Sequence, residues 1–179
     1  MKTFFKGFCI GLLSLSLLGL LWFLVLQPGL TNKEAQDLKE EYAQPLPGES
    51  SGELPAGKEQ AASLVNLSAL QAEYPDIQGW ISIPGTCVDY PVLQSSADEP
   101  EYYLRRTYKG EHRTAGSIFF QWDCSPESKN LVVYGHNMSD GTMFAVLQKM
   151  TDEAFRNEHS KILLQTSNGL REYQIAAVL

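Results

Sequence analysis

Residues 130–147 carry the stretch NLVVYGHNMSDGTMFAVL, from which the rest of the chain can be interpreted. The stretch begins with an apolar run at residues 131–134, and its β-branched and aromatic side chains predict a buried strand. Gly135 lets the backbone leave that strand sharply, because glycine has no Cβ to restrict its dihedral angles. His136 comes next, and apolar residues resume with helical spacing at residues 143–147. The stretch therefore predicts a strand, a turn that bears a histidine, and a helix.

His136 is the candidate catalytic residue of this stretch. An imidazole changes its charge near neutral pH without a large environmental shift, so it suits proton transfer at the mouth of a strand. A histidine at a strand end can also be an ordinary hydrogen-bonded structural residue, and its position alone leaves both interpretations open. The other histidines, His112 and His159, are isolated in the sequence and add no pattern.

The composition narrows the class of protein. The chain has 179 residues and a formal net charge of −7, so its length fits one domain and its acidic balance argues against a nucleic-acid partner. Cys9, Cys87 and Cys124 form no CxxC pair, so they indicate neither a disulfide framework nor a zinc site. Cys87 and Cys124 can pair only if their Cα atoms come close. The sequence has no glycine-rich phosphate loop and no cluster of metal ligands, so we expect no cofactor and no metal.

The N-terminal segment predicts a membrane anchor. Residues 8–26 form an uncharged run that is long enough to cross a hydrocarbon core as a helix. Lys2 and Lys6 precede the run and mainly acidic residues follow it, so we expect a cytoplasmic N-terminus and an extracellular remainder. The alternative is a cleaved signal peptide, although residues 27–29 lack the small-residue pattern of a cleavage site. We interpret residues 1–28 as a cytoplasmic stub and a single-pass transmembrane helix in the cell membrane.

Residues 29–60 predict an extracellular helix followed by a flexible linker. Residues 31–42 are charged and predict a short, solvated helix with Thr31 or Asn32 as its N-cap. Residues 44–60 are rich in proline, glycine, serine and glutamate, and they contain too little apolar surface to pack. We expect this region to hold the folded part of the chain away from the membrane.

Residues 61–179 predict a mainly β domain with short helices. We expect helices at residues 61–74 and 151–159, a loop or short helix at 95–110, strands at 80–83, 88–93, 117–122 and 131–134, and a hairpin of residues 162–165 and 173–179. Asn168 and Gly169 mark the turn of that hairpin. Short strands separated by small helices favour an antiparallel or mixed barrel over a βαβ fold.

Several segments of this domain together resemble class B sortases. They are GWISIPGTCVDYPVLQ (residues 79–94), YYL (102–104), AGSIFFQWD (115–123), NLVVYGHNMSDGTMF (130–144) and KILLQTSNGLREYQIAAV (161–178). The match keeps its order from residue 64 to residue 179, and the pattern YGHNM…DGTMF is specific to that family. The preceding anchor and linker also fit, because sortases are membrane-tethered ectodomains on Gram-positive cells.

The resemblance implies an eight-stranded sortase β-barrel and a cysteine transpeptidase. Such an enzyme cuts a C-terminal sorting signal after threonine, holds the acyl group as a thioester, and transfers it to an amine of the cell wall. The implied partners are a secreted surface protein with that signal and, as acceptor, a peptidoglycan precursor or a pilin amine. His136 occupies the family's histidine position, where it protonates the leaving amine and later accepts a proton from the incoming one. A thiolate attacks the carbonyl, and an arginine steadies the developing charge.

The resemblance places that cysteine and that arginine on strands beyond Leu179. Cys87, Cys124 and the arginines of this chain, up to Arg171, lie outside those positions. The sequence stops inside an apolar strand, so we expect a barrel that is incomplete at its C-terminal side, folds poorly alone and lacks transpeptidase activity. Two alternatives stay open: a non-catalytic, membrane-tethered binding module, and a hydrolase that uses Cys124 with His136.

Overall fold

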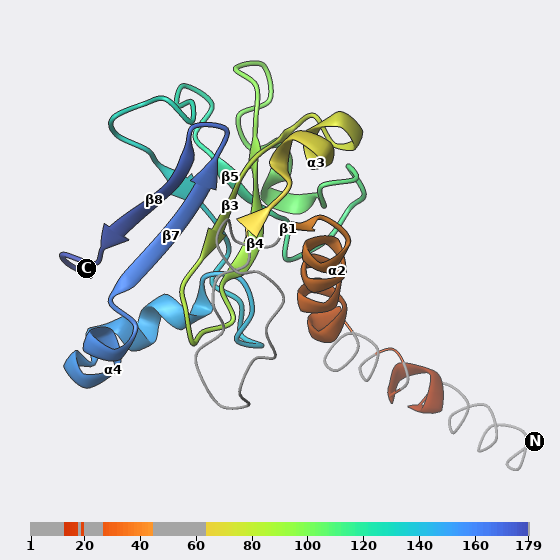
Figure 1. Ribbon diagram of the computed structural model, residues 1–179. Coiled ribbons are helices and arrows are strands. Elements are labelled where there is room, and N and C mark those ends of the chain that lie inside the picture. Colours follow the sequence, from red (N-terminus) through yellow and green to blue (C-terminus); the bar gives the residue numbers. More distant parts are fainter. Residues whose placement is uncertain (1–12, 18, 20–26, 45–63, 179) are drawn as a thin grey trace, which may run out of the picture.

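The computed structural model describes residues 13–17, 19, 27–44 and 64–178 (Figure 1). The predicted linker at residues 44–60 lies outside the described residues except for Gln44, and most of the predicted transmembrane run at residues 8–26 also lies outside them. Within the described ranges, no helix is both long and apolar enough to cross a membrane. The anchor and the linker stay predictions.

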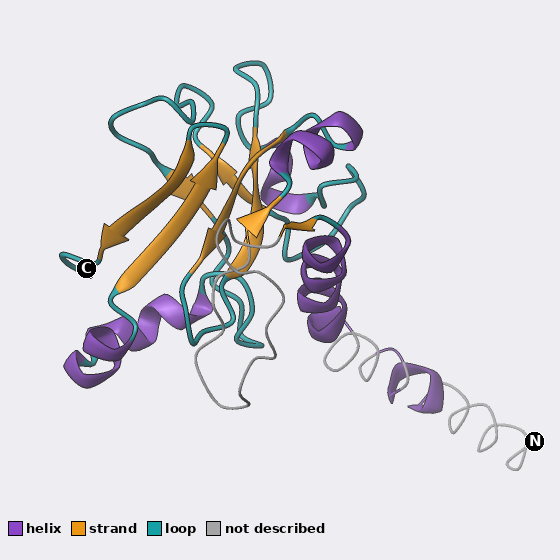
Figure 2. Ribbon diagram, viewed as in Figure 1, coloured by secondary structure: helices purple, strands orange, loops and turns teal. Residues whose placement is uncertain are grey.

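A six-stranded mixed sheet organises the described chain (Figures 1 and 2). Its strands are β3 (Ile77–Ser82), β4 (Asp89–Gln94), β5 (Ile118–Phe120), β6 (Val133–Tyr134), β7 (Lys161–Thr166) and β8 (Gly169–Gln174). The strand order is β6-β5-β4-β3-β7-β8; β4 and β5 are parallel, and the other neighbours are antiparallel. The prediction of a mixed, mainly β fold with short helices is confirmed. The described strands form an open sheet with β6 and β8 at its edges, so closure into a barrel stays a prediction.

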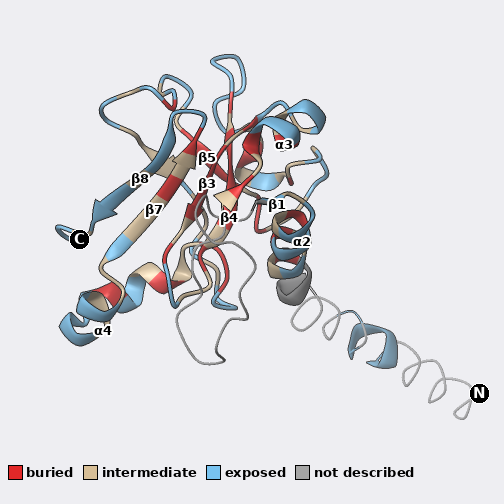
Figure 3. Cartoon of the chain, in the orientation of Figure 1, coloured by how far each residue is buried: buried red, intermediate tan, exposed pale blue. Residues whose placement is uncertain are grey.

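The central strands are largely buried (Figure 3), and apolar side chains pack on both of their faces. Successive residues of a strand point to opposite faces of a sheet. Neighbouring residues accordingly divide between two buried clusters: Trp80 and Leu93 belong to one, and Ile81 and Val92 belong to the other. Burial on both faces explains why β4 contains a continuous apolar run at residues 90–93.

The parallel pairing of β4 with β5 requires a crossover connection, because a tight hairpin joins only antiparallel strands. Residues 95–117 form this crossover, which includes the 3-10 helix η2 (Tyr102–Arg105) at the predicted place. The buried Tyr103 fixes η2: its hydroxyl donates to the carboxylate of Asp76, and its carbonyl accepts the N–H of Ser117 at 3.0 Å. The crossover is therefore anchored to the sheet.

Helix α2 (Gln27–Glu41) differs from the solvated helix that the sequence predicted. Because α2 begins at Gln27, Thr31 and Asn32 lie inside the helix and neither is its N-cap. Thr31, Ala35 and Leu38 are buried, at a spacing that places them on one side of a helix. Figure 1 shows α2 beside β4, which explains this burial.

Ion pairs fix α2 to the rest of the fold. Lys39 Nζ lies 2.7 Å from a carboxylate oxygen of Asp89 in β4, and Arg113 Nη2 lies 2.6 Å from Glu34 Oε2. These charges made the segment seem solvated in the sequence. In the structure, Lys39 and Glu34 form ion pairs with the rest of the domain. The charge of the segment therefore did not distinguish a packed helix from a solvated one.

The edges of the sheet require two corrections. Residues 131–134 form only the two-residue strand β6 and no buried run, since Val133 is half-buried and Tyr134 is 44% exposed. The physical reason is that β6 is an edge strand, which pairs with β5 alone. Strand β8 ends at Gln174, whereas the sequence predicted a strand at residues 173–179. The tight turn between β7 and β8 is confirmed, but its two central residues are Ser167 and Asn168, and Gly169 already begins β8.

Short helices and a small second sheet complete the described fold. They are β1 (Ala43–Gln44), β2 (Leu64–Val65), α3 (Leu67–Glu73), the 3-10 helix η3 (Ala145–Thr151) and α4 (Glu153–Glu158). Asn66 is the N-cap of α3, because its Oδ1 accepts the N–H of Ala69 at 3.1 Å. The helix predicted at residues 61–74 thus begins at Leu67, and the helical spacing after residue 143 belongs to η3.

We expect Leu38→Ala to lower the free energy of unfolding by about 2–4 kcal/mol, because truncation of a buried leucine removes apolar contacts and leaves a cavity. The control Gln36→Ala, at an exposed position of the same helix, should change it by less than about 0.5 kcal/mol. Urea unfolding followed by tryptophan fluorescence measures both. Equal effects of the two substitutions would mean that α2 does not pack on the sheet.

Candidate active site

His136 follows β6 and Gly135 and begins a closed loop of residues 136–144. The N–H of Phe144 donates to the carbonyl of His136 at an N–O distance of 2.9 Å. Asn137 and Met143 pair across the loop as an isolated antiparallel bridge. These contacts join the two ends of the loop, so the histidine is carried on a fixed backbone.

Gly135 and Asp140 shape this loop. A Cβ at residue 135 would lie 2.6 Å from the ring of Phe144, while φ of Gly135 is not positive. Glycine is therefore required for close approach of the ring, which corrects the interpretation that it provides an unusual backbone turn. At the tip, Asp140 Oδ1 accepts the N–H of Thr142 at 2.9 Å and its hydroxyl at 2.6 Å, as in an Asx turn.

The half-buried imidazole of His136 has a defined partner. Its Nε2 lies 2.9 Å from the carbonyl oxygen of Leu104 in η2. A carbonyl oxygen only accepts hydrogen bonds, so Nε2 must carry a proton. Nδ1 is then the nitrogen that is free to gain or lose a proton in chemistry, which suits a general acid or base.

The carbonyl of Leu104 is itself fixed by a close backbone contact. Gly116 has φ +58, and a Cβ there would lie 2.3 Å from Leu104 O and 2.6 Å from Tyr103 O. No side chain fits in that space, and a left-handed residue is strained in any case unless it is glycine. Gly116 therefore lets the crossover fold tightly enough to present the carbonyl to His136.

Residues of the His136 loop also line two hollows. One, of about 710 Å³, lies between the turn of residues 85–87, the loop residues 137–141, and parts of η3 and α4. The other, of about 400 Å³, is lined mainly by apolar side chains, including Leu131, Val133 and Phe144, together with residues of β3 and β7. Both hollows lie beside the His136 loop and are large enough to hold part of a peptide.

The described cysteines have partners other than His136. Cys87 and Cys124 are both free thiols, so they form no disulfide with each other. Cys87 Sγ donates to the carbonyl of Gly141 at 3.2 Å, and burial raises the pKa of this thiol, which disfavours the reactive thiolate. Cys124 Sγ lies 3.7 Å from the carbonyl of Asn130. Neither contact pairs a thiol with the imidazole.

Most of the arginines that lie outside the catalytic position implied by the resemblance contact other groups of the fold. Arg105 donates to the carbonyl of Thr114, Arg156 donates to that of Met150, and Arg106 lies over the ring of Tyr102. Arg113 forms the ion pair with Glu34 described above. Over the described part of the chain, no group of three or more histidine, cysteine or acidic side chains is placed to hold a metal ion.

The structure adds one contact of the candidate site that the sequence analysis missed. The segment YYL was recognised as part of the resemblance, but the carbonyl of Leu104 was not identified as the partner of His136. A main-chain carbonyl is present at every residue, so no side-chain pattern marks this one. The glycine at residue 116 is its only sequence signal, and it is informative only once the backbone path is known.

The chain is similar to proteins of one family. The family model described as the sortase domain matches residues 81–179. Sortase B of Listeria monocytogenes serovar 1/2a (strain EGD-e) is 41% identical over 111 residues, and sortase B of Staphylococcus aureus (strain NCTC 8325) is 36% identical over 113 residues. Each match covers 61% of this chain and 44% of the relative, so the chain spans less than half the length of these relatives.

Solved structures of sortase B share the fold. The structure of sortase B from B. anthracis in complex with AAEK2 has a TM-score of 0.65 at 32% identity, over 87% of this chain and 67% of that one. A structure of sortase B complexed with triglycine has a TM-score of 0.56 at 34% identity, over 60% and 50% of the two chains. The Staphylococcus aureus sortase B–substrate complex has a TM-score of 0.58 at 27% identity, over 82% and 60%. These matches show a mixed, sortase-like half-barrel sheet with short helices.

We expect Gly116→Ala to break the hydrogen bond between His136 Nε2 and Leu104 O, because the added Cβ would overlap that carbonyl. Long-range ¹H–¹⁵N spectra at about pH 9, where an imidazole is neutral, should show His136 protonated at Nε2 in the parent protein and a mixture of tautomers in the variant. Gly141→Ala is the matched control, since Gly141 also has a positive φ (+84) but has no atom within 4 Å of an added Cβ. The same tautomer in both variants would contradict the assignment.

Proposed function

The chain belongs to the sortase B family, and on that premise we propose that the protein is a class B sortase, a cysteine transpeptidase. It would cleave a C-terminal sorting signal after threonine and attach surface proteins to the cell wall. The observation that carries the proposal is His136, which the closed loop and the Leu104 carbonyl hold in one orientation within the sortase region of the chain.

His136 supplies the proton-transfer part of this mechanism. Its Nε2–H stays bonded to the Leu104 carbonyl in both the neutral and the charged ring, so that nitrogen is not the one that exchanges protons. Nδ1 in the charged ring protonates the leaving amine when the thioester forms. Nδ1 in the neutral ring then accepts a proton from the incoming amine, which completes the transfer.

The thiolate and the arginine of this mechanism are proposed to come from sequence that follows residue 179. The motivation is that Cys87, Cys124 and four of the arginines make other contacts here, and that the chain spans 44% of its relatives' length. Sequencing the coding region beyond codon 179 tests this. We expect the same reading frame to encode a strand that ends in Thr-Cys and then a strand with an arginine. If it does not, the proposal that this protein is an enzyme is wrong.

The proposed partners follow from the family. One similar sortase B was solved with a substrate and another with triglycine. We infer that this protein binds a sorting-signal peptide as acyl donor and a cell-wall amine, such as the N-terminus of a short glycine peptide, as acceptor. Peptide binding without cleavage or transfer by the complete protein would favour the non-catalytic binding module instead.

We also propose that residues 8–26 anchor the protein in the cell membrane, with the N-terminus in the cytoplasm and the sortase region outside. The supporting pattern is the uncharged run preceded by Lys2 and Lys6. The protein should stay in the membrane fraction after an alkaline wash, and protease added to protoplasts should digest its sortase region. Recovery in the soluble fraction, or protection from the protease, would contradict this placement.

We expect His136→Ala to reduce cleavage of a fluorogenic sorting-signal peptide by the complete protein by about 10²–10⁴-fold, because proton transfer to the leaving amine is lost. The control His112→Ala changes an exposed histidine on the crossover and should stay within about twofold of the parent rate. Steady-state kinetics of both variants decide the matter. Activity of His136→Ala equal to that of the control would exclude His136 as the general acid.

A further inference from the structure

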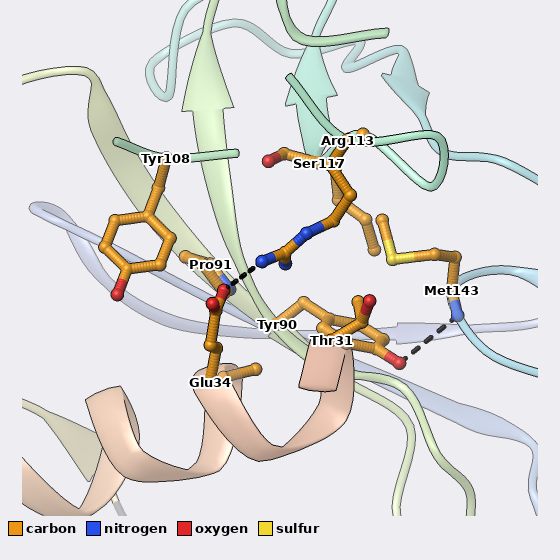
Figure 4. Close-up of a pocket in the computed structure, with 11 residues that line it drawn as sticks. Thr31, Glu34, Tyr90, Pro91, Tyr108, Arg113, Ser117 and Met143 are labelled. Carbon is orange, nitrogen blue, oxygen red and sulfur yellow. Dashed lines mark hydrogen bonds and ion pairs between the residues drawn. The ribbon is translucent and has the colours of Figure 1, made fainter. Parts of the chain in front are cut away.

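The hydroxyl of Tyr90 connects helix α2 to the loop that carries His136. Figure 4 shows the contact of this hydroxyl with Met143 of that loop. Tyr90 lies in β4 and is only 4% exposed. Its hydroxyl donates to Oδ1 of Asn32 in α2 and accepts the N–H of Met143 at 3.2 Å. Elements far apart in the sequence therefore meet at one oxygen atom.

Met143 has an unusual backbone conformation in this loop. Its φ is +56, and in the described chain it is the one residue other than glycine with a positive φ. A non-glycine residue keeps such a conformation only where its surroundings fix it. Met143 is buried, pairs with Asn137 next to His136, and precedes Phe144, whose N–H bonds the His136 carbonyl. A change in the backbone of Met143 would therefore be transmitted to His136.

Helix α2, which carries Asn32, is fixed to the rest of the fold by two ion pairs. Figure 4 shows the ion pair between Glu34 of α2 and Arg113 of the crossover, beside Tyr90. The ion pair between Lys39 and Asp89 joins α2 to the residue that precedes Tyr90 in β4. Burial raises the pKa of Tyr90 to about 12, so its hydroxyl keeps its proton and its donor role across the neutral range.

We propose that Tyr90 and Asn32 are positioning residues for His136: the Tyr90 hydroxyl, oriented by Asn32, holds Met143 in its left-handed conformation and thereby sets the orientation of the His136 loop. The catalytic consequence rests on the function proposed above, whereas the geometric consequence concerns only the loop. Helix α2 is, on this view, part of the support of the active site.

The test compares variants of the complete protein. Tyr90→Phe removes the hydroxyl and keeps the aromatic ring. If Tyr90→Phe fails to fold, Asn32→Leu serves instead, because it removes the hydrogen-bond acceptor and leaves the Tyr90 ring in the core intact. Asn32→Asp is the conservative variant that retains the acceptor oxygen, and Gln36→Leu is the control at an exposed position of α2. The readouts are the ring ¹H–¹⁵N signals of His136, the amide signal of Met143, and kcat and KM for a sorting-signal peptide.

Tyr90→Phe and Asn32→Leu should shift the His136 ring and Met143 amide signals and lower kcat by about tenfold, with KM changed by less than about twofold. Asn32→Asp and Gln36→Leu should leave both signals and kcat within about twofold of the parent. A loss of stability with unchanged His136 signals would make Tyr90 merely structural and overturn the inference. Absence of cleavage by the parent protein would reject the proposed function, and the NMR signals would still decide the positioning role.

Discussion

The hydrogen bond between His136 and the Leu104 carbonyl depends on how two distant segments of the chain meet. Strands β4 and β5 are parallel, so the chain must leave the sheet and return, and η2 lies on that crossover. Strand β6 has two residues and lies at the edge of the sheet, so pairing with β5 alone does little to orient the residues after it. The crossover therefore fixes the orientation of the His136 ring, through the Leu104 carbonyl, where strand pairing does not.

Polar contacts at the border of the core tie the elements together. Asp89 accepts from the Trp80 ring N–H at 2.8 Å and from Lys39, so one carboxylate joins β3, β4 and α2. A partly buried carboxylate is stable only if its oxygens are satisfied, and here charged and neutral donors share that role. The same border includes Tyr90, whose hydroxyl serves both α2 and the histidine loop. Packing and site geometry are therefore coupled through a few oxygen atoms.

The sequence predicted the features that depend on local side-chain patterns. The central strands, the β7–β8 turn and the candidate His136 each have a signal within a few residues. The Leu104 carbonyl had none, because its role arises from a contact across the fold. Helix α2 was misjudged for a related reason: its buried stripe contains one threonine, one alanine and one leucine, and only the neighbouring sheet reveals it. The exposure of β6 followed from its edge position, which local composition does not encode.

The use of a main-chain acceptor for His136 has a genetic consequence. An amino-acid substitution at position 104 replaces a side chain and leaves a main-chain carbonyl, so it does not remove the chemical group that His136 contacts. The constraint falls on position 116, where even one methyl group would overlap that carbonyl. Selection on the orientation of His136 would therefore be recorded at residue 116, which has no side chain, whereas at residue 104 it would act on the packing of the leucine and not on the carbonyl.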